Sequence, residues 1–245
     1  MALLVKKTTE NNIDLLKQEW DTWGKTDAFW AVLTDPSKKG NRWDESDFFA
    51  TGKQHVDWIM ENLKKAGVSI NPQRALDFGC GVGRITRALT RHFKKTIGVD
   101  IAPSMIQKAR ELNAQFNCRF EVTPDPALAP IQSERFDFIT SWIVFQHMNK
   151  ELATEYLATL AQLLEKDGVL FVQVASHRYL PGIGLLAFLR KWVLRQMGPT
   201  IRMHGFPRAE VEAALRKAGL NIVAVQDDHS CGWSWKSYSY LAQKR

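Results

Sequence analysis

The spacing of apolar residues divides the chain into two parts near residue 74. Across residues 1–70, apolar side chains recur at helical spacing, and Gly67 follows the last of them as a stop. Beyond residue 74, short apolar runs alternate with helical patterns, which is typical of a parallel sheet buried on both faces. The pattern therefore predicts an N-terminal helical cap, 1–70, followed by an α/β domain, 71–245.

Seven apolar runs in the second part have the length of strands, namely 74–78, 96–100, 119–122, 136–141, 168–175, 221–226 and 235–242. Helices are expected from the first strand's glycine loop to about His92, from Pro103, over 150–165 and from Pro207. The turn Asp167-Gly168 is expected to end the third helix before the fifth strand. Residues 178–206 then interrupt the alternation with a basic, aromatic stretch. These elements predict a doubly wound, seven-stranded, mostly parallel, Rossmann-like sheet with a lid insertion after the fifth strand.

A glycine-rich turn follows the first strand. The segment from Ala75 to Arg84 reads Ala-Leu-Asp-Phe-Gly-Cys-Gly-Val-Gly-Arg, so three alternating glycines precede a helix. Such glycines let a ligand approach the backbone, and the free N–H groups of the helix N-terminus attract a carboxylate or phosphate. Asp100 ends the second strand, where a carboxylate can accept both hydroxyls of a ribose. A nucleoside cofactor is therefore expected at this edge of the sheet.

Two residues distinguish between nucleoside cofactors. The dinucleotide spacing G-x-G-x-x-G would require glycine at position 84, where this chain has arginine. Asp77, two residues before the turn, would repel a diphosphate but would suit a cofactor with an ammonium and a sulfonium group. Both observations favour S-adenosylmethionine, and a nicotinamide-dependent Rossmann oxidoreductase is the disfavoured alternative.

The segment 76–84 resembles motif I of the class I S-adenosylmethionine-dependent methyltransferases, and 98–100 resembles the end of their second strand. The segment 136–139 is similar to their fourth strand, and 163–170 to the helix, turn and fifth strand that follow. The resemblance spans roughly 74–176. It implies an enzyme that uses S-adenosylmethionine and releases S-adenosylhomocysteine.

The resemblance also implies roles for single residues. Asp77 and the glycines would surround the methionyl part of the cofactor, Asp100 would hold the ribose, and Ile101 would pack on the adenine. In this family an acidic residue after the third strand usually reaches the adenine amino group; Asp125 is the candidate here, but two prolines flank it and a turn residue is the equal alternative. The predicted cofactor-binding residues are Asp77, Gly79, Cys80, Gly81, Gly83, Arg84, Asp100, Ile101, Asp125, Ser141 and Trp142.

The acceptor is expected beside the segment Ser141 to His147, which follows the fourth strand along the ligand-binding edge. This segment does not resemble the Asn/Asp-Pro-Pro-aromatic signature of nucleic-acid amino methyltransferases, and the chain has no Pro-Cys nucleophile. Both absences favour methyl transfer to oxygen or nitrogen of a small-molecule acceptor. A protein or RNA acceptor is kept as an alternative because the chain is basic, and so is a regulatory protein that binds the cofactor without turnover.

A histidine could serve as a base if the acceptor is a hydroxyl. The candidate catalytic residues are His147, His204 and His229, although a structural or cofactor-contacting role is the stronger interpretation for His147. His55 is expected at the surface. The candidate acceptor-binding residues are Trp30, Trp43, Phe49 and Tyr179; the alternative is that these aromatic side chains only seal the cap to the core.

Composition supports a globular protein. The chain has 245 residues, of which 45% are hydrophobic, but no run approaches the ~20 apolar residues of a membrane span. The first residues lack the pattern of a secretory signal, so a cytoplasmic location is expected. The three cysteines are far apart and lack metal-ligand spacing, which predicts reduced thiols and no metal site. The net charge is +7, and the basic residues from Arg84 to Lys95 are expected on a solvated helix face; the sequence does not determine the oligomeric state.

Overall fold

The computed structural model describes residues 2–178, 202–232 and 234–245, and for residues 2–12 it describes the backbone alone. Most of the predicted lid, 178–206, and the candidate Tyr179 therefore lie outside the described residues. No helix in the described part of the chain is long and apolar enough to cross a membrane.

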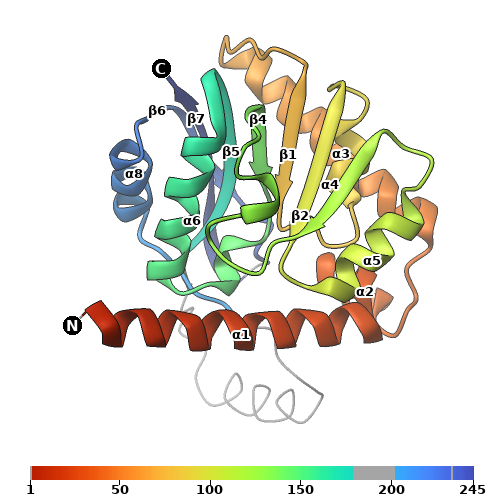
Figure 1. Cartoon of the computed structure of the whole chain (residues 1–245). Coiled ribbons are helices and arrows are strands. Elements are labelled where there is room, and N and C mark those ends of the chain that lie inside the picture. The colour runs from red at the N-terminus through yellow and green to blue at the C-terminus, as the bar shows by residue number, and fades with distance from the viewer. Residues whose placement is uncertain (1, 179–201, 233) are drawn as a thin grey trace.

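A seven-stranded sheet forms the centre of the protein (Figure 1). Side by side, the strands are β3 (Cys118–Val122), β2 (Lys95–Asp100), β1 (Arg74–Phe78), β4 (Phe136–Ser141), β5 (Leu164–Arg178), β7 (Trp235–Lys244) and β6 (Leu220–Asp228). The first five pair in parallel, and β7 is antiparallel to both β5 and β6. The predicted doubly wound, mostly parallel sheet of seven strands is confirmed.

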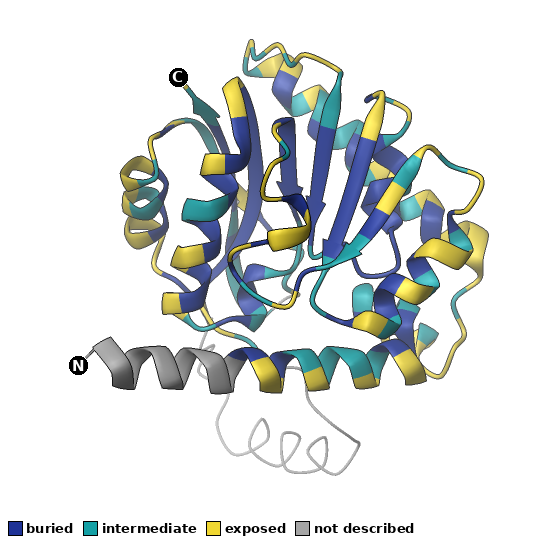
Figure 2. Ribbon diagram, in the orientation of Figure 1, coloured by how far each residue is buried: buried dark blue, intermediate teal, exposed yellow. Residues whose placement is uncertain are grey.

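Helices cover both faces of this sheet, as Figure 2 shows by the dark blue strands between helices with yellow outer sides. The helices of the α/β part are α4 (Arg84–Leu89), α5 (Pro103–Leu112), α6 (Lys150–Leu163) and α8 (Arg208–Lys217), with the short turns η2 (Ala129–Ile131) and η3 (Phe145–His147). The N-terminal part contains α1 (Ala2–Thr26), α2 (Ala28–Val32), η1 (Pro36–Lys38) and α3 (Glu45–Lys65). Helices α3 and α4 pack on one face, and α6 and α8 pack on the other.

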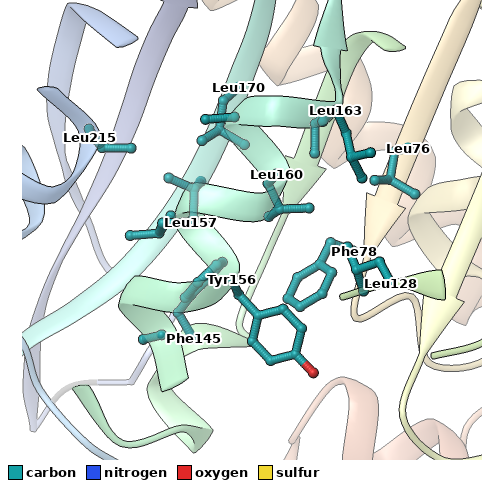
Figure 3. Close-up of a cluster of buried hydrophobic side chains, with 14 of the residues drawn as sticks. Leu76, Phe78, Leu128, Phe145, Tyr156, Leu157, Leu160, Leu163, Leu170 and Leu215 are labelled. Atoms are coloured by element: carbon teal, nitrogen blue, oxygen red, sulfur yellow. The ribbon is translucent and has the colours of Figure 1, made fainter. Parts of the chain in front are cut away.

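The side chains of β1 alternate between the two faces of the sheet. Leu76 and Phe78 point into the cluster under α6, which Figure 3 shows together with Leu160 and Tyr156. Ala75 lies in the opposite cluster under α3 and α4. Because strand side chains alternate between faces, both clusters draw on the same short apolar run.

The fifth strand is longer at both ends than predicted, and the helix after the glycine turn ends at Leu89 and not near His92. The fifth strand begins at Leu164, directly after α6, and not at residue 168. Leu164 already pairs with Phe136 of β4, so the chain is extended before the predicted turn. Asp167 takes a positive φ of 62°, and the register shifts at this point. The Asp167-Gly168 turn is therefore an irregularity inside the strand.

Helix α1 runs past the edge at which the parallel strands end (Figure 1). Its C-terminal half is fixed to the first turn of α5. The Oδ1 atom of Asp21 accepts the Ser104 N–H at 2.9 Å, and the Asp21 carbonyl accepts the Ser104 hydroxyl at 2.8 Å. Gly24 lies so close that an added Cβ would stand 2.2 Å from the Ser104 Oγ. These contacts hold α1 over the edge where a ligand is expected.

Candidate active site

A cavity of about 70 Å³ lies at the carboxyl ends of β1, β2 and β4. Here the strand order reverses, because β1 lies between β2 and β4, and doubly wound sheets bind ligands at such a switch point. The N-terminal helices close the cavity through Leu16, Trp20, Ala31 and Val32. Most of the wall is apolar, so the site is a hydrophobic pocket that is partly open to the surface.

The glycine turn forms the floor of this cavity. Gly79 and Gly81 have φ values of 74° and 52°, a left-handed conformation that favours glycine. A Cβ on Gly79 would stand 2.4 Å from the Val144 Cγ2, and one on Gly81 would stand 2.5 Å from the Val32 Cγ2. The turn therefore requires glycine for its conformation and also for close approach, and it leaves a backbone cradle.

Asp100 connects this cradle to the end of β2. Its Oδ2 accepts the Gly81 N–H at 2.9 Å, and its Oδ1 accepts the Ala102 N–H at 2.9 Å. Burial raises the pKa of the Asp100 carboxyl. Each carboxylate oxygen accepts more than one hydrogen bond, so Asp100 can orient the turn and still accept the hydroxyls of a ribose.

Asp77 and Arg84 lie beneath the turn, on the side of α3 and α4. The Asp77 Oδ2 accepts the Thr86 hydroxyl at 2.7 Å, and burial raises the pKa of Asp77 to about 6. Arg84 is only 5% exposed, so the expectation that it lies on a solvated helix face is wrong. Its Nε has no hydrogen-bond partner among the described residues, and its Nη1 donates a long bond of 3.3 Å to the Thr51 hydroxyl. Burial lowers the pKa of Arg84 to about 10.

His55, which the sequence places at the surface, packs instead behind the wall of the cavity. Its ring centroid lies 3.6 Å from that of Trp142, which lines the cavity, and 5.6 Å from that of Trp58. The Nε2 atom is buried and has no partner within the described part of the chain. Burial lowers the pKa of His55 well below its usual value. The ring is half-buried because α3 places it against Trp142, just after β4, an arrangement that a lone histidine in a helical pattern does not indicate.

His147 in η3 lies in the cavity wall. Its Nδ1 is 2.8 Å from the carbonyl oxygen of Arg202. A carbonyl only accepts, so Nδ1 carries the proton and Nε2 keeps its lone pair. Burial lowers the pKa of His147 to about 4, and the ring meets Trp20 edge-on at 5.0 Å. His147 is therefore neutral at physiological pH.

The structure brings some of the predicted residues together and separates others. Those in the cavity wall are Gly79, Gly81, Asp100, Ile101, Trp142 and His147. Cys80 and Ser141 are buried, and Gly83 faces Asn113 and Phe120 behind the turn. Asp125 uses its Oδ1 to accept the Ala127 N–H at 2.8 Å. His204 and His229 are exposed.

Three of the candidate acceptor-binding residues, Trp30, Trp43 and Phe49, lie within the N-terminal helical part. The indole N–H of Trp30 donates to the Asp35 carbonyl at 2.9 Å, and that of Trp43 donates to the Leu33 carbonyl at 3.1 Å. Phe49 packs against the guanidinium group of Arg87, 3.1 Å from its ring centroid. None of these three described side chains belongs to the cavity wall.

Several residues of the wall are not among the predicted site residues. They are Leu16, Trp20, Ala31, Val32, Phe78, Val99, Thr123, Ile143, Val144, Met148 and Tyr156. The sequence indicates Tyr156 only as a buried helix residue, yet Figure 3 shows its hydroxyl directed away from the apolar cluster. The spacing of Leu16 and Trp20 puts both on one side of α1, but nothing in that pattern identifies what the side covers.

The described residues include no group of three His, Cys, Asp or Glu side chains that could hold a metal ion. They do fit S-adenosylmethionine, because a glycine cradle, a carboxylate at the end of β2 and an apolar wall meet in one place. Fold and site thus define a doubly wound α/β protein with a nucleoside site. A family model described as a methyltransferase domain matches residues 50–225. The chain belongs to this methyltransferase family, and S-adenosylmethionine is its cofactor.

Known proteins similar to this chain include a ubiquinone biosynthesis O-methyltransferase from Xanthomonas axonopodis pv. citri, 27% identical over 194 residues that cover 74% of this chain and 77% of the relative. The magnesium protoporphyrin IX methyltransferase of Synechocystis PCC 6803, solved with bound S-adenosylhomocysteine, has a TM-score of 0.64 at 20% identity over 96% of this chain and 100% of its own. The N-methyltransferase NodS of Bradyrhizobium japonicum WM9 has a TM-score of 0.61 at 17% identity, and the match covers 94% of this chain and 98% of NodS. At these identities the two structures show a common fold.

Proposed function

We propose that this methyltransferase transfers a methyl group from S-adenosylmethionine to oxygen or nitrogen of a small-molecule acceptor. The observation that carries the proposal is the mainly apolar cavity over the glycine turn, whose wall includes side chains of α1 and α2. A small acceptor fits a site that α1 and α2 cover, whereas a nucleic acid or a folded protein needs an open surface. The relatives named for ubiquinone biosynthesis and for magnesium protoporphyrin support a small acceptor.

When bound, the cofactor would supply an activated methyl carbon to an acceptor lone pair, with the electron pair of the carbon–sulfur bond left on sulfur and the proton of the acceptor lost to water. The protein contributes alignment and exclusion of water. Gly79 and Gly81 would hold the methionyl part, Asp100 the ribose, and Ile101 the adenine. The hydrophobic side chains of α1 and α2 would keep water from the reacting atoms.

We propose that His147 contacts the methyl acceptor. A neutral ring with Nδ1 bonded to the Arg202 carbonyl offers Nε2 as a hydrogen-bond acceptor. An O–H or N–H of the methyl acceptor would donate to it and present its lone pair to the methyl group. The low pKa of about 4 makes the ring a weak base, so orientation is its proposed role.

The proposal also includes the predicted domain division and the predicted location of the enzyme. Residues 1–70 would act as the helical cap of the methyltransferase domain, 71–245. The enzyme would work in the cytoplasm, in keeping with the free thiols of Cys80, Cys118 and Cys231.

The test combines binding and turnover. Calorimetry should show that the protein binds S-adenosylhomocysteine and that Asp100→Asn, which weakens the hydrogen bonds to the ribose and the turn, binds it at least tenfold less tightly. With methyl-labelled cofactor and a cell extract, label should pass to the dialysable fraction. Label confined to RNA or protein, with turnover that falls steeply with salt, would overturn the small-molecule acceptor.

A further inference from the structure

The loop after β4 holds a backbone conformation that its own residue disfavours. Ile143 has a φ of 60°, in the left-handed region, where a β-branched side chain crowds the backbone. Ile143 and its neighbours Trp142 and Val144 all line the cavity. A conformation of this kind persists only where surrounding contacts hold it, so the structure must contain such a contact.

A network of hydrogen bonds connects Ile143 to four other parts of the fold. The Oε1 of Gln173, in β5, accepts the Ile143 N–H at 3.1 Å, and its Nε2 donates to the Cys231 Sγ at 2.9 Å. The Cys231 thiol donates to the Oε1 of Gln146 at 2.7 Å. The Gln146 carbonyl accepts the His204 N–H at 2.6 Å. These hydrogen bonds therefore join β5, the turn between β6 and β7, η3 and the segment before α8.

Gln173 is the member that touches the strained residue. It is fully buried, so its amide needs partners on both sides. The pairing of β4 with β5 ends at Ser141 and Val172. Ile143 lies beyond that end, and its N–H is bonded by the glutamine side chain instead of a neighbouring strand.

Val144 carries the effect to the cofactor site. Its two Cγ atoms lie 2.4 and 2.6 Å from the point where a Cβ on Gly79 would stand, so this side chain rests directly on the glycine turn. If Ile143 relaxed to a negative φ, Val144 would move away from Gly79. The wall of the cofactor cavity would then change shape.

We propose that Gln173 is a positioning residue which, through Ile143 and with support from Cys231 and Gln146, holds the loop after β4 against the glycine turn and sets the shape of the cofactor cavity. The proposal rests on the cofactor site described above. Gln173 itself does not line the cavity and acts through the loop.

The test measures cofactor binding by calorimetry with S-adenosylhomocysteine. Gln173→Leu keeps the size of the side chain but removes the acceptor of the Ile143 N–H, and affinity should fall about tenfold, or ~1.4 kcal/mol. Adding Ile143→Gly to Gln173→Leu should restore most of the affinity, because glycine adopts a positive φ without strain. A purely structural role of Gln173 would predict no such recovery.

The control is Gln226→Leu, which removes one side-chain hydrogen bond of 3.0 Å, to Asn62, away from the cavity. It should lower the melting temperature and leave the affinity unchanged. If Gln173→Leu does not fold, Cys231→Ala should weaken binding, whereas Cys231→Ser, which keeps a donor and an acceptor, should not. Equal affinity of Gln173→Leu and wild type, or no recovery with Ile143→Gly, would overturn the proposal. Failure of the wild type to bind would instead refute the cofactor site itself.

Discussion

The buried charges beneath the glycine turn are the most informative single residues of this protein. Asp77 bonds to Thr86, while Arg84 has an unpartnered Nε in the described structure. A buried guanidinium is costly unless an anion compensates it. Burial lowers the pKa of Arg84 more than the nearby Asp77 carboxylate raises it, so Asp77 offsets the cost only in part. The amino-acid end of S-adenosylmethionine carries one carboxylate and one ammonium group. We therefore expect Arg84 to serve the carboxylate and Asp77 the ammonium.

Replacing Arg84 tests this pairing of charges. Arg84→Met should bind S-adenosylhomocysteine about tenfold less tightly, since one charged contact contributes ~1.4 kcal/mol or more. Binding of 5′-methylthioadenosine, which lacks the amino-acid end, should change less than threefold. The matched control is Arg87→Met on the same helix, because Arg87 already bonds to Asn113. Equal losses for both ligands in Arg84→Met would assign the residue to folding alone.

His147 permits a prediction about pH. Burial lowers its pKa to about 4, so the ring stays neutral from pH 8 down to about 5, and kcat should show no inflection near 6.5 that depends on it. His147→Phe should lower kcat about tenfold, which corresponds to one lost orienting hydrogen bond, with little change in affinity for S-adenosylhomocysteine. The measurement is kcat as a function of pH for the wild type and for His147→Phe. An acid limb near 6.5 that disappears in His147→Phe would show that the ring titrates at its ordinary value.

At the scale of elements, α1 and α2 control access to the cofactor site. The cavity of about 70 Å³ is far smaller than the ~300–1,000 Å³ of sites for molecules of this size. Val32 of α2 also rests on Gly81, where the cofactor is expected. We therefore expect the N-terminal helices to shift when the cofactor binds.

Loosening the attachment of α1 should speed this displacement. Asp21→Ala removes the acceptor of the Ser104 N–H, so the open form becomes more populated. The association rate of S-adenosylhomocysteine, followed by stopped-flow tryptophan fluorescence, should rise several-fold. Asp57→Ala, on α3, breaks ion pairs with Lys53 and with Arg91, which follows α4, and it should leave the rate unchanged. An unchanged rate in Asp21→Ala would mean that α1 does not limit entry.

At the scale of the whole molecule, buried titratable groups link stability to pH with opposite signs. The lowered pKa values of His55 and His147 mean that the folded state binds fewer protons than the unfolded state below about 6.5, so the free energy of unfolding falls as pH falls. Asp77 has a raised pKa of about 6 and works in the other direction, because its contribution is lost as pH rises through 6. The change of the free energy of unfolding with pH is the sum of these effects.

His55 can be separated from the others by substitution. His55→Phe keeps an aromatic ring between Trp58 and Trp142 and removes the titration. The difference in melting temperature between pH 7 and pH 5 should therefore be smaller in this variant than in the wild type. His229→Gln, at an exposed position, provides the control and should keep the wild-type difference. A larger difference in His55→Phe would mean that protonation of His55 does not destabilise the folded state.

The sequence by itself determined the sheet and the glycine turn. Continuous apolar runs specify β1 to β5 because a buried parallel strand must be apolar on both faces. Gly79, Gly81 and Asp100 follow from local rules of backbone conformation and strand ends. It also indicated S-adenosylmethionine, since these residues are close together along the chain.

Only the tertiary structure decided what covers the site. Trp20 and Val32 reach the cavity from helices distant in sequence, Tyr156 turns its hydroxyl out of a helix that looked purely structural, and Asp125 is used in its own turn. Likewise, Arg84 becomes buried where α4 packs on α3, and His55 becomes half-buried where α3 packs against Trp142. Local patterns fix which face of an element is apolar, but the element that meets this face depends on long-range packing, which periodicity does not encode.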